Sequence, residues 1–172
     1  KKTSEMARDL KNSLIEIYSI YFLGLAYSRQ QRMEEAIRCL SKFVALAKEK
    51  NISLGMFIAL FFLAEFYSYL GNISMTKEIL AEAEQYSESG NVSFVRQWKN
   101  RLLTYCQVFS PAPDLYQADE LIDVAQKTSR EMGQGYEYHH AHNALTKALV
   151  LFLKDQHEAG EKHFAEALAV YE

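Results

Sequence analysis

Three closely spaced histidines are the residues of this sequence best suited to metal or proton chemistry. They are His139, His140 and His142, and the first and third could share one face of a helix, where two imidazoles can bind zinc. The alternative interpretation, which we favour, is that these histidines are solvated or line a groove at a helix corner. We therefore expect no metal site.

Two other motifs match known sites only in part. His157 and His163 border a segment similar to the helix of zinc proteases, in which two histidines are four residues apart. Here the separation is six residues, so the second histidine faces away from the first. Gly133-Gln134-Gly135 lacks the third glycine of a phosphate-binding loop and has no preceding strand, so it is typical of a helix corner.

Paired carboxylates occur at Glu34–Glu35 and at Asp119–Glu120. Both pairs fall on segments that we expect to be outer helices, where solvated charges are the simplest interpretation. The sequence pairs no nucleophile with a base. It therefore predicts a protein that is not an enzyme and needs no cofactor.

The composition favours a helical protein that contacts neither nucleic acid nor membrane. Of 172 residues, 49% are apolar and 24% are charged, and 2 Pro and 7 Gly are too few for a many-stranded β fold. The net charge of −3 provides no excess of cations to pair with phosphates. The longest apolar run, residues 55–64, is about half the length that a bilayer requires.

The cysteines and the first residues favour a cytoplasmic protein. Cys39 and Cys106 lie in separate apolar segments and are expected to be buried, reduced thiols; a single disulfide is the alternative. The chain opens without the apolar segment of a signal peptide.

A repeat of about 40 residues organises the chain. A shift of 40 superimposes serines that follow an asparagine, aliphatic or aromatic residues, and tyrosines. They are Ser13, Ser53 and Ser93; Leu14, Leu54 and Phe94; Leu23, Leu63 and Leu103; and Tyr27 and Tyr67.

The recurring Asn-x-Ser segments predict helix-to-helix corners. Asparagine can adopt the left-handed conformation that ends a helix, and a serine two residues later can cap the next one. The segments begin at Asn51, Asn72 and Asn91. They also match the glycosylation motif, but without a secretion signal we expect no glycosylation.

Between the corners, apolar residues follow helical spacing. Residues 33–47 carry one apolar stripe, whereas residues 54–70 are apolar on nearly every side and need cover from several directions. Covered inner helices alternating with striped outer helices are typical of stacked hairpins. We expect helices near 14–29, 33–49, 54–70, 74–88, 93–109, 114–131, 136–154 and 157–171.

The first residues are expected to belong to an earlier repeat. Lys11-Asn12-Ser13 repeats the corner at residues 50–53, so residues 1–11 are predicted to be the end of a preceding outer helix. We therefore expect the chain to be part of a longer solenoid, whose open ends would allow weak self-association.

The repeats resemble the tetratricopeptide (TPR) pattern, in which W-x2-L-G-x2-Y is followed by A-x3-F. The pattern expects small residues where two helices cross closely and large residues beside them. The matching residues are Leu23, Gly24, Tyr27, Ala36, Leu40 and Phe43; Leu63, Ala64, Tyr67, Thr76, Leu80 and Ala83; Leu103, Ala118, Ile122 and Ala125; and Ala148, Leu151, Gly160, Phe164 and Ala167.

The repeats depart from the TPR pattern in a longer period, in lacking the leading Trp and in lacking the closing Pro. In this they are similar to repeats of the maltose-activator type of LuxR-family transcription regulators, of spindle-orientation scaffolds and of kinesin light chains. Armadillo and HEAT repeats have a similar length but do not suit the Leu-Gly-x2-Tyr segment. The resemblance implies an all-α, right-handed solenoid of antiparallel helix hairpins in one domain, 1–172, with about four repeats near 13–50, 53–90, 93–132 and 135–172.

In TPR-like arrays the inner helices line a concave groove, which implies a site here. Its aromatic surface would suit a protein or peptide with apolar anchors. The alternative is that the aromatic residues pack between helices. The predicted lining residues are Tyr18, Tyr21, Phe61, Glu65, Trp98, Arg101, Tyr105 and His142, flanked by Leu25, Ile58, Tyr69, Phe109, Leu145 and Leu149.

The resemblance excludes one kind of partner and leaves two functions. Phe22 and Phe62 occupy the positions at which co-chaperone TPR domains use asparagine to bind a carboxylate, so a chaperone tail is not expected. We predict a protein–protein or peptide-binding scaffold module within a larger protein. The alternative is the ligand-sensing arm of a multidomain LuxR-type transcription regulator.

Overall fold

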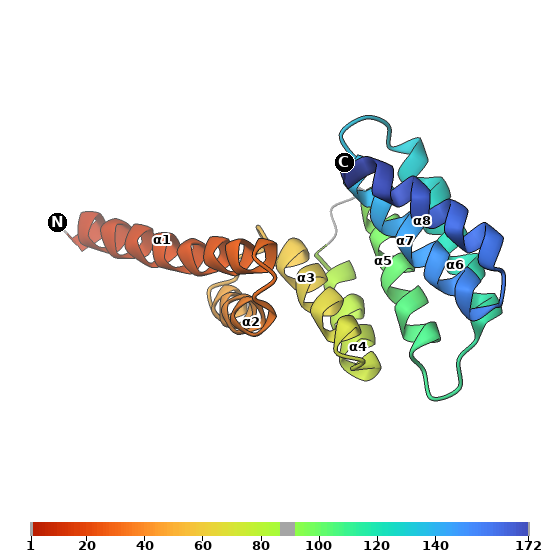
Figure 1. Ribbon diagram of the computed structural model, residues 1–172. Coiled ribbons are helices and arrows are strands. Elements are labelled where there is room, and N and C mark those ends of the chain that lie inside the picture. The colour runs from red at the N-terminus through yellow and green to blue at the C-terminus, as the bar shows by residue number, and fades with distance from the viewer. Residues whose placement is uncertain (1, 87–91, 172) are drawn as a thin grey trace. The chain divides into compact units, whose positions relative to one another are not determined.

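The computed structural model describes residues 2–86 and 92–171 of the chain. Within these ranges there are eight α-helices and no strand, which confirms the predicted all-α class (Figure 1). The helices are α1 (Lys2–Arg29), α2 (Met33–Glu49), α3 (Met56–Tyr69), α4 (Ile73–Glu84), α5 (Val92–Val108), α6 (Leu115–Glu131), α7 (Glu137–Leu153) and α8 (His157–Tyr171).

The helices form two compact units. The first unit extends to Phe66 and also contains Glu78–Tyr86, and the second contains Tyr67–Lys77 and the described residues from Val92 onward. In the first unit α1 packs on α2, and Lys48 of α2 forms an ion pair of 2.7 Å with Glu82 of α4. In the second unit α5 packs on α6, α7 packs on α8, and α6 also contacts α7.

The predicted corner at Lys11-Asn12-Ser13 is wrong, because α1 continues through it without a break (Figure 1). Residues 1–11 are therefore not the end of a separate outer helix. The segment before Gly24 contains neither glycine nor proline, and Leu10, Leu14 and Ile17 continue one helical spacing across it. A lone asparagine does not end a helix when the apolar pattern continues on both sides.

Of the asparagine corners, the one at Asn51 is confirmed. Asn51 has a φ of 54°, and the N–H of Ile52 donates to the carbonyl of Ala47 at 2.8 Å, as in a helix that closes with a left-handed residue. The next helix begins later than expected, at Met56, because Gly55 still has a φ of 85°. Ser53 therefore does not directly precede α3.

At the second corner the asparagine has the opposite role. Gly71 takes the left-handed conformation with a φ of 71°, and the side chain of Asn72 accepts a hydrogen bond from the N–H of Met75 at 3.2 Å. Asn72 is therefore the N-cap of α4, and Ser74 lies inside that helix. Asn91 lies outside the described residues, and Ser93 falls within α5 rather than before it.

Three hairpins turn in the same way. Gln31, Gly71 and Asp155 each have a positive φ and lie two residues after the end of the first helix of a hairpin. In each case the next N–H donates back to a first-helix carbonyl, at 2.9–3.0 Å: Arg32 to Tyr27, Asn72 to Tyr67 and Gln156 to Leu151. The fourth hairpin, α5–α6, carries Pro111 and Pro113 in a longer connection, and Asp114 caps α6.

Corresponding positions of the four hairpins are buried alike. The first helices bury a small residue at Gly24, Ala64, Thr104 and Ala148. The second helices bury Ala36, Leu40 and Phe43; Thr76, Leu80 and Ala83; Ala118, Ile122 and Ala125; and Gly160 and Ala167. Phe164 is the exception among the pattern residues of the second helices, because nearly half of its surface is exposed.

The small residues permit close helix crossings. A Cβ added to Gly24 would lie 2.8 Å from the side chain of Leu40, and one added to Gly160 would lie 2.7 Å from Phe152. The expected close approach is therefore confirmed at both glycines. Leu63 is buried as expected, whereas Tyr67, near the end of α3, is only half-buried, since its phenol can keep one edge in water.

Two further expectations can be compared with these helices. Cys39 and Cys106 are both free thiols, but only Cys106 is buried, and burial raises its pKa. In the ranges that the structure describes, no helix has the apolar length that a bilayer crossing requires.

Replacement of Gly24 by alanine is expected to destabilise the first unit by about 1–3 kcal/mol, since the added methyl group must displace Leu40. Helix propensity alone would give the opposite sign, a gain of about 1 kcal/mol. Urea denaturation followed by circular dichroism measures the difference. In a Leu40→Ala background the loss should shrink. If Gly24→Ala stabilised the otherwise unchanged protein, the crossing at this position would not be close.

Candidate binding site

The residues predicted to line a groove divide between the two units. Those on α1 and α3 lie in the first unit, and those on α5 and α7 lie in the second, where these two helices are in contact. The first set is Tyr18, Tyr21, Phe61 and Glu65, and the second is Trp98, Arg101, Tyr105 and His142. A continuous surface formed by all eight stays a prediction.

Several of the predicted groove residues are packed within the protein. Tyr21, Phe61 and Trp98 are all buried. The ring of Tyr21 lies 4.9 Å from that of Phe43 on α2, between centroids. The burial of these three aromatic residues favours the alternative interpretation, packing between helices.

A chain of buried amide groups links three helices of the second unit. The Nδ2 of Asn143 on α7 donates to the backbone carbonyl of Ala125 on α6 at 3.2 Å. The same amide donates to the Oε1 of Gln97 on α5 at 3.2 Å, and the Nε2 of Gln97 lies 3.4 Å from the Nδ1 of His139. Gln97 and Asn143 are fully buried.

Only one orientation of the Asn143 and Gln97 side-chain amides is consistent with all of these hydrogen bonds. A backbone carbonyl can only accept, so Ala125 requires the NH₂ group of Asn143 to face it. The amide of Gln97 is then oriented with its NH₂ group toward His139, so the Nδ1 of His139 must accept. His139 is therefore neutral, with its proton on Nε2.

Arg101 adds a buried positive charge beside the same histidines. It is 2% exposed, and its guanidinium lies 6.0 Å from the ring centre of Trp98. Burial, reinforced by the charge of Arg101, lowers the pKa of His139 to about 4 and that of His142 to about 3. Both imidazoles are accordingly uncharged at neutral pH.

The carboxylate pair at Asp119 and Glu120 was predicted to be solvated, and for Asp119 this is wrong. Its two oxygens bind Lys147 at 2.7 Å and Lys154 at 2.6 Å, which joins α6 to α7. Partial burial raises the pKa of Asp119, but the hydrogen bonds from Lys147 and Lys154 lower it, and the pKa lies below its usual value. The helical pattern placed Asp119 correctly on α6 but could not show that α7 supplies two lysines.

Partly exposed aromatic side chains lie beside the polar core. We call Tyr69, Tyr105 and Phe109 the aromatic row; Tyr69 ends α3 and the other two lie on or just after α5. The ring of Tyr105 lies 5.6 Å from Tyr69, edge-on, and 6.1 Å from Phe109, nearly parallel. Tyr69 is 45% exposed and Phe109 50% exposed.

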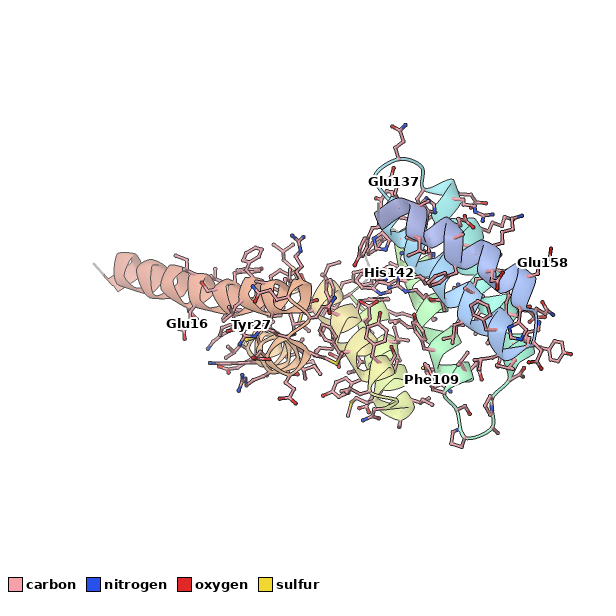
Figure 2. The ribbon with its side chains drawn as sticks, viewed as in Figure 1. Glu16, Tyr27, Phe109, Glu137, His142 and Glu158 are labelled. Atoms are coloured by element: carbon pink, nitrogen blue, oxygen red, sulfur yellow. The ribbon has the colours of Figure 1, made fainter. Side chains whose placement is uncertain are left out.

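The middle of the aromatic row is anchored to α7. The hydroxyl of Thr146 donates to the carbonyl of His142 at 2.8 Å, so the Tyr105 hydroxyl, 3.0 Å away, donates to Thr146. The ring of His142 in turn lies 4.4 Å from that of Tyr138. Figure 2 shows Phe109 at the end of α5 and His142 on α7. The row is thus a set of rings already held in place.

The histidines of the cluster have different neighbours in the described part of the chain. No group of three or more His, Cys, Asp or Glu side chains there is placed to bind a metal ion. His139 and His142 lie near Arg101, which repels a cation, whereas His140 contacts Ser129 at 3.0 Å. His163, in α8, lies 3.2 Å from Glu166.

An open cleft of about 440 Å³ lies at the corner between α6 and α7. Part of its wall is an ion pair of 3.3 Å between Arg130 and Glu166. The N–H of Gly135 donates to the side chain of Glu137, the first residue of α7, at 3.0 Å. The Gly133-Gln134-Gly135 segment is therefore hydrogen-bonded to the start of the next helix. The lining residues are Arg130, Gly133, Gln134, Glu137, His140 and Glu166.

Comparison with known proteins gives no match from which the role of the site could be inferred. No family model matches the chain, and a search of curated proteins finds no match.

Gln97 and Asn143 were missed by the sequence analysis. Asn143 follows His139 by four residues and precedes Lys147 by four, so these three residues form a polar stripe along one face of α7. Such a stripe could have indicated a buried polar contact. Nothing in the sequence, however, connects it with Gln97, which is 46 residues away.

Acidification from about pH 6.5 to about pH 4.5 is expected to lower the free energy of unfolding by about 1–3 kcal/mol. The folded-state pKa values of His139 and His142 lie below the ordinary 6.5, so the unfolded chain binds more protons in this interval. The stability that neutral histidines allow is complete above pH 6.5 and is lost as the pH falls. Urea denaturation across this interval measures it, with the fluorescence of Trp98 as a local probe.

His139→Asn is the informative variant, because Asn keeps an acceptor for Gln97 but cannot be protonated. It should reduce the acid sensitivity, whereas His157→Asn, at an exposed position, should leave it unchanged. Equal acid sensitivity in both variants would exclude His139 as a cause.

Proposed function

We propose that the chain is a TPR-like helical-repeat module, a right-handed solenoid of antiparallel hairpins, that binds a segment of another protein. The equivalent turns at Gln31, Gly71 and Asp155 and the recurrent burial of one small residue in each first helix support the repeat. The binding proposal depends on the aromatic row.

The exposure of the aromatic row is the observation that carries the proposal. Large apolar rings exposed side by side are costly in water and are typical of binding surfaces. Tyr105 is held by Thr146, and its neighbours Tyr69 and Phe109 contact its ring. Since these rings are already ordered, a partner would immobilise few additional side chains on binding.

The chemistry of the surface favours apolar anchors over charged ones. Arg101 is buried and His142 is neutral at physiological pH, so neither attracts a carboxylate from solution. The hydroxyl of Tyr105 is engaged with Thr146. The preferred partner is an amphipathic segment whose Leu, Met or Phe side chains pack on the rings.

A small-molecule inducer, as in a regulator's sensing arm, is the second candidate. The cleft of about 440 Å³ at the α6–α7 corner has the volume of a small-molecule site. A ligand there would have to compete with the ion pair between Arg130 and Glu166. We therefore rank the aromatic row first.

Selection from a phage-displayed library of random peptides tests the proposal. Peptides that bind the protein are expected to carry apolar residues at helical spacing. Phe109→Ala and Tyr69→Ala should each weaken a selected peptide about tenfold, or about 1.4 kcal/mol, measured by fluorescence anisotropy.

Tyr116→Ala is the matched control, because Tyr116 is an exposed aromatic residue of α6 that is not part of the aromatic row. Its peptide affinity should equal that of the unchanged protein, and circular dichroism should show all three variants folded. If Tyr116→Ala weakened binding as much as Phe109→Ala, the aromatic row would not be the binding surface.

A further inference from the structure

Two adjacent histidines in the first turn of α7 contact different helices through the same ring nitrogen. The Nδ1 of His139 lies 3.4 Å from the Nε2 of Gln97 on α5, and the Nδ1 of His140 lies 3.0 Å from the hydroxyl of Ser129 on α6. Whether each nitrogen donates or accepts depends on what its partner offers, and the two partners differ.

His140 donates to its partner. The hydroxyl of Ser129 gives its single hydrogen to the carbonyl of Gln126 at 3.0 Å, because a carbonyl only accepts. Ser129 is then the acceptor for His140, so the Nδ1 of His140 carries a proton. A charged His140 keeps that proton, and its contact with α6 is therefore the same in acid.

His139 accepts from its partner, and the partner cannot change its role. If the amide of Gln97 turned over to offer its oxygen to His139, its NH₂ group would face the NH₂ group of Asn143. Asn143 cannot turn over in its place, because it donates to the carbonyl of Ala125. A protonated His139 therefore loses its hydrogen bond to α5.

The charges around His139 also disfavour its protonation. Burial, and then the charges of Arg101 on α5 and of His140, lower the pKa of His139 to about 4. His142, one turn later, has Arg101 and His139 as its charged neighbours, and its pKa is lowered further, to about 3. A positive charge in the first turn of a helix is opposed by the helix dipole as well.

The remaining ionisable groups near His139 do not compensate for this. Glu137, at the start of α7 in Figure 2, accepts a hydrogen bond from the N–H of Gly135 at 3.0 Å. Tyr136 and Tyr138, whose ring centres lie 6.0 Å and 6.4 Å from that of His139, are phenols, which stay uncharged in acid. Water is then the favourable environment for an imidazolium, and the half-buried His139 can reach it.

The ring of His139 packs against aromatic residues of α5. Its centre lies 6.1 Å from that of Trp98 and 5.2 Å from that of Phe94, to which it is perpendicular. Trp98 is 4% exposed, whereas Phe94 is half-buried. Departure of the imidazole would therefore give water access to the indole.

The other bonds between these helices do not involve His139. His140 is bonded to α6, Tyr105 of α5 donates to Thr146 of α7, and Asp119 of α6 binds two lysines of α7. Each of these contacts keeps its partner when His139 is protonated. The first response to acid is therefore confined to one side chain and the surface that it covers.

We propose that His139 is an acid-operated gate over Trp98: once protonated, its imidazole leaves Gln97 and moves into water, while α5, α6 and α7 remain packed. His140 holds the start of α7 on α6 in both states of the gate. The gate is independent of the peptide binding proposed above.

Acrylamide quenching of Trp98 fluorescence tests the gate, because Trp98 is the single tryptophan of the chain. Quenching should increase several-fold as the pH falls from about 6.5 to about 3.5. The midpoint should lie near the pKa of His139, about 4, with the helical circular dichroism unchanged. Quenching that stays constant until the helices unfold would overturn the proposal.

The two adjacent histidines provide a matched pair of variants. In His139→Asn the new side chain can accept from Gln97 at any pH, so the quenching should not change with pH. In His140→Asn the new side chain can donate to Ser129, and the quenching should increase in acid as in the unchanged protein. A response to acid that persists in His139→Asn, or that is lost in His140→Asn, would contradict the assignment of the gate to His139.

Gln97→Glu should reverse the gate. A carboxylate at this position can still accept from Asn143, but its second oxygen needs a donor from His139. The folded-state pKa of His139 should then rise above the ordinary value of about 6.5, so His139 is held below that pKa and released as the pH rises through it. Trp98 should accordingly be more accessible at high pH than at about pH 5. Opening in acid, as in the unchanged protein, would overturn the role of Gln97.

The tautomers of the unchanged protein provide a test that does not depend on the folding of any variant. Nitrogen chemical shifts of the imidazoles, measured by NMR at neutral pH, should show His139 protonated on Nε2 alone and His140 protonated on Nδ1. A proton on the Nδ1 of His139 would mean that Gln97 does not donate to it, and the proposal would be wrong.

Discussion

The close crossing of the two helices within a hairpin is the contact on which the other packing depends. At Gly24 and at Gly160, the partner side chain occupies the space that a Cβ would need. The residues that correspond to Gly24 in the other first helices, Ala64, Thr104 and Ala148, are also small and buried. A larger residue would separate the helices and open the apolar layer between them, since protein interiors are packed at nearly crystalline density.

A hairpin built in this way has a second face that its own partner cannot cover. In the second unit α7 covers α6 with an apolar cluster around Ile122 and with an ion pair to Asp119. In α8, Phe164 corresponds to Ile122 and is exposed instead. The same helical pattern is therefore buried in one hairpin and exposed in another.

The second unit also contains more buried polar groups than a simple helical repeat requires. The backbone carbonyl of Ala125 orients Asn143, which orients Gln97, which requires a neutral His139. Such a chain specifies one relative placement of α5, α6 and α7, because a shift of any helix would leave buried amides without partners. The stabilisation depends on pH, because a protonated His139 could no longer accept a hydrogen bond from Gln97.

The sequence by itself determined the helical class and most helix bounds, because apolar periodicity is a local property. The predicted bounds of α2 and α8 and the left-handed residue at Asn51 are correct. The predicted break in α1 at Asn12 is wrong, because the prediction followed a short Asn-Ser motif although the helical apolar spacing continues through it. Only the tertiary structure decided that Trp98 and Arg101 are buried and that Asp119 binds two lysines. These outcomes depend on which side chains distant helices bring into contact, and no local pattern contains that information.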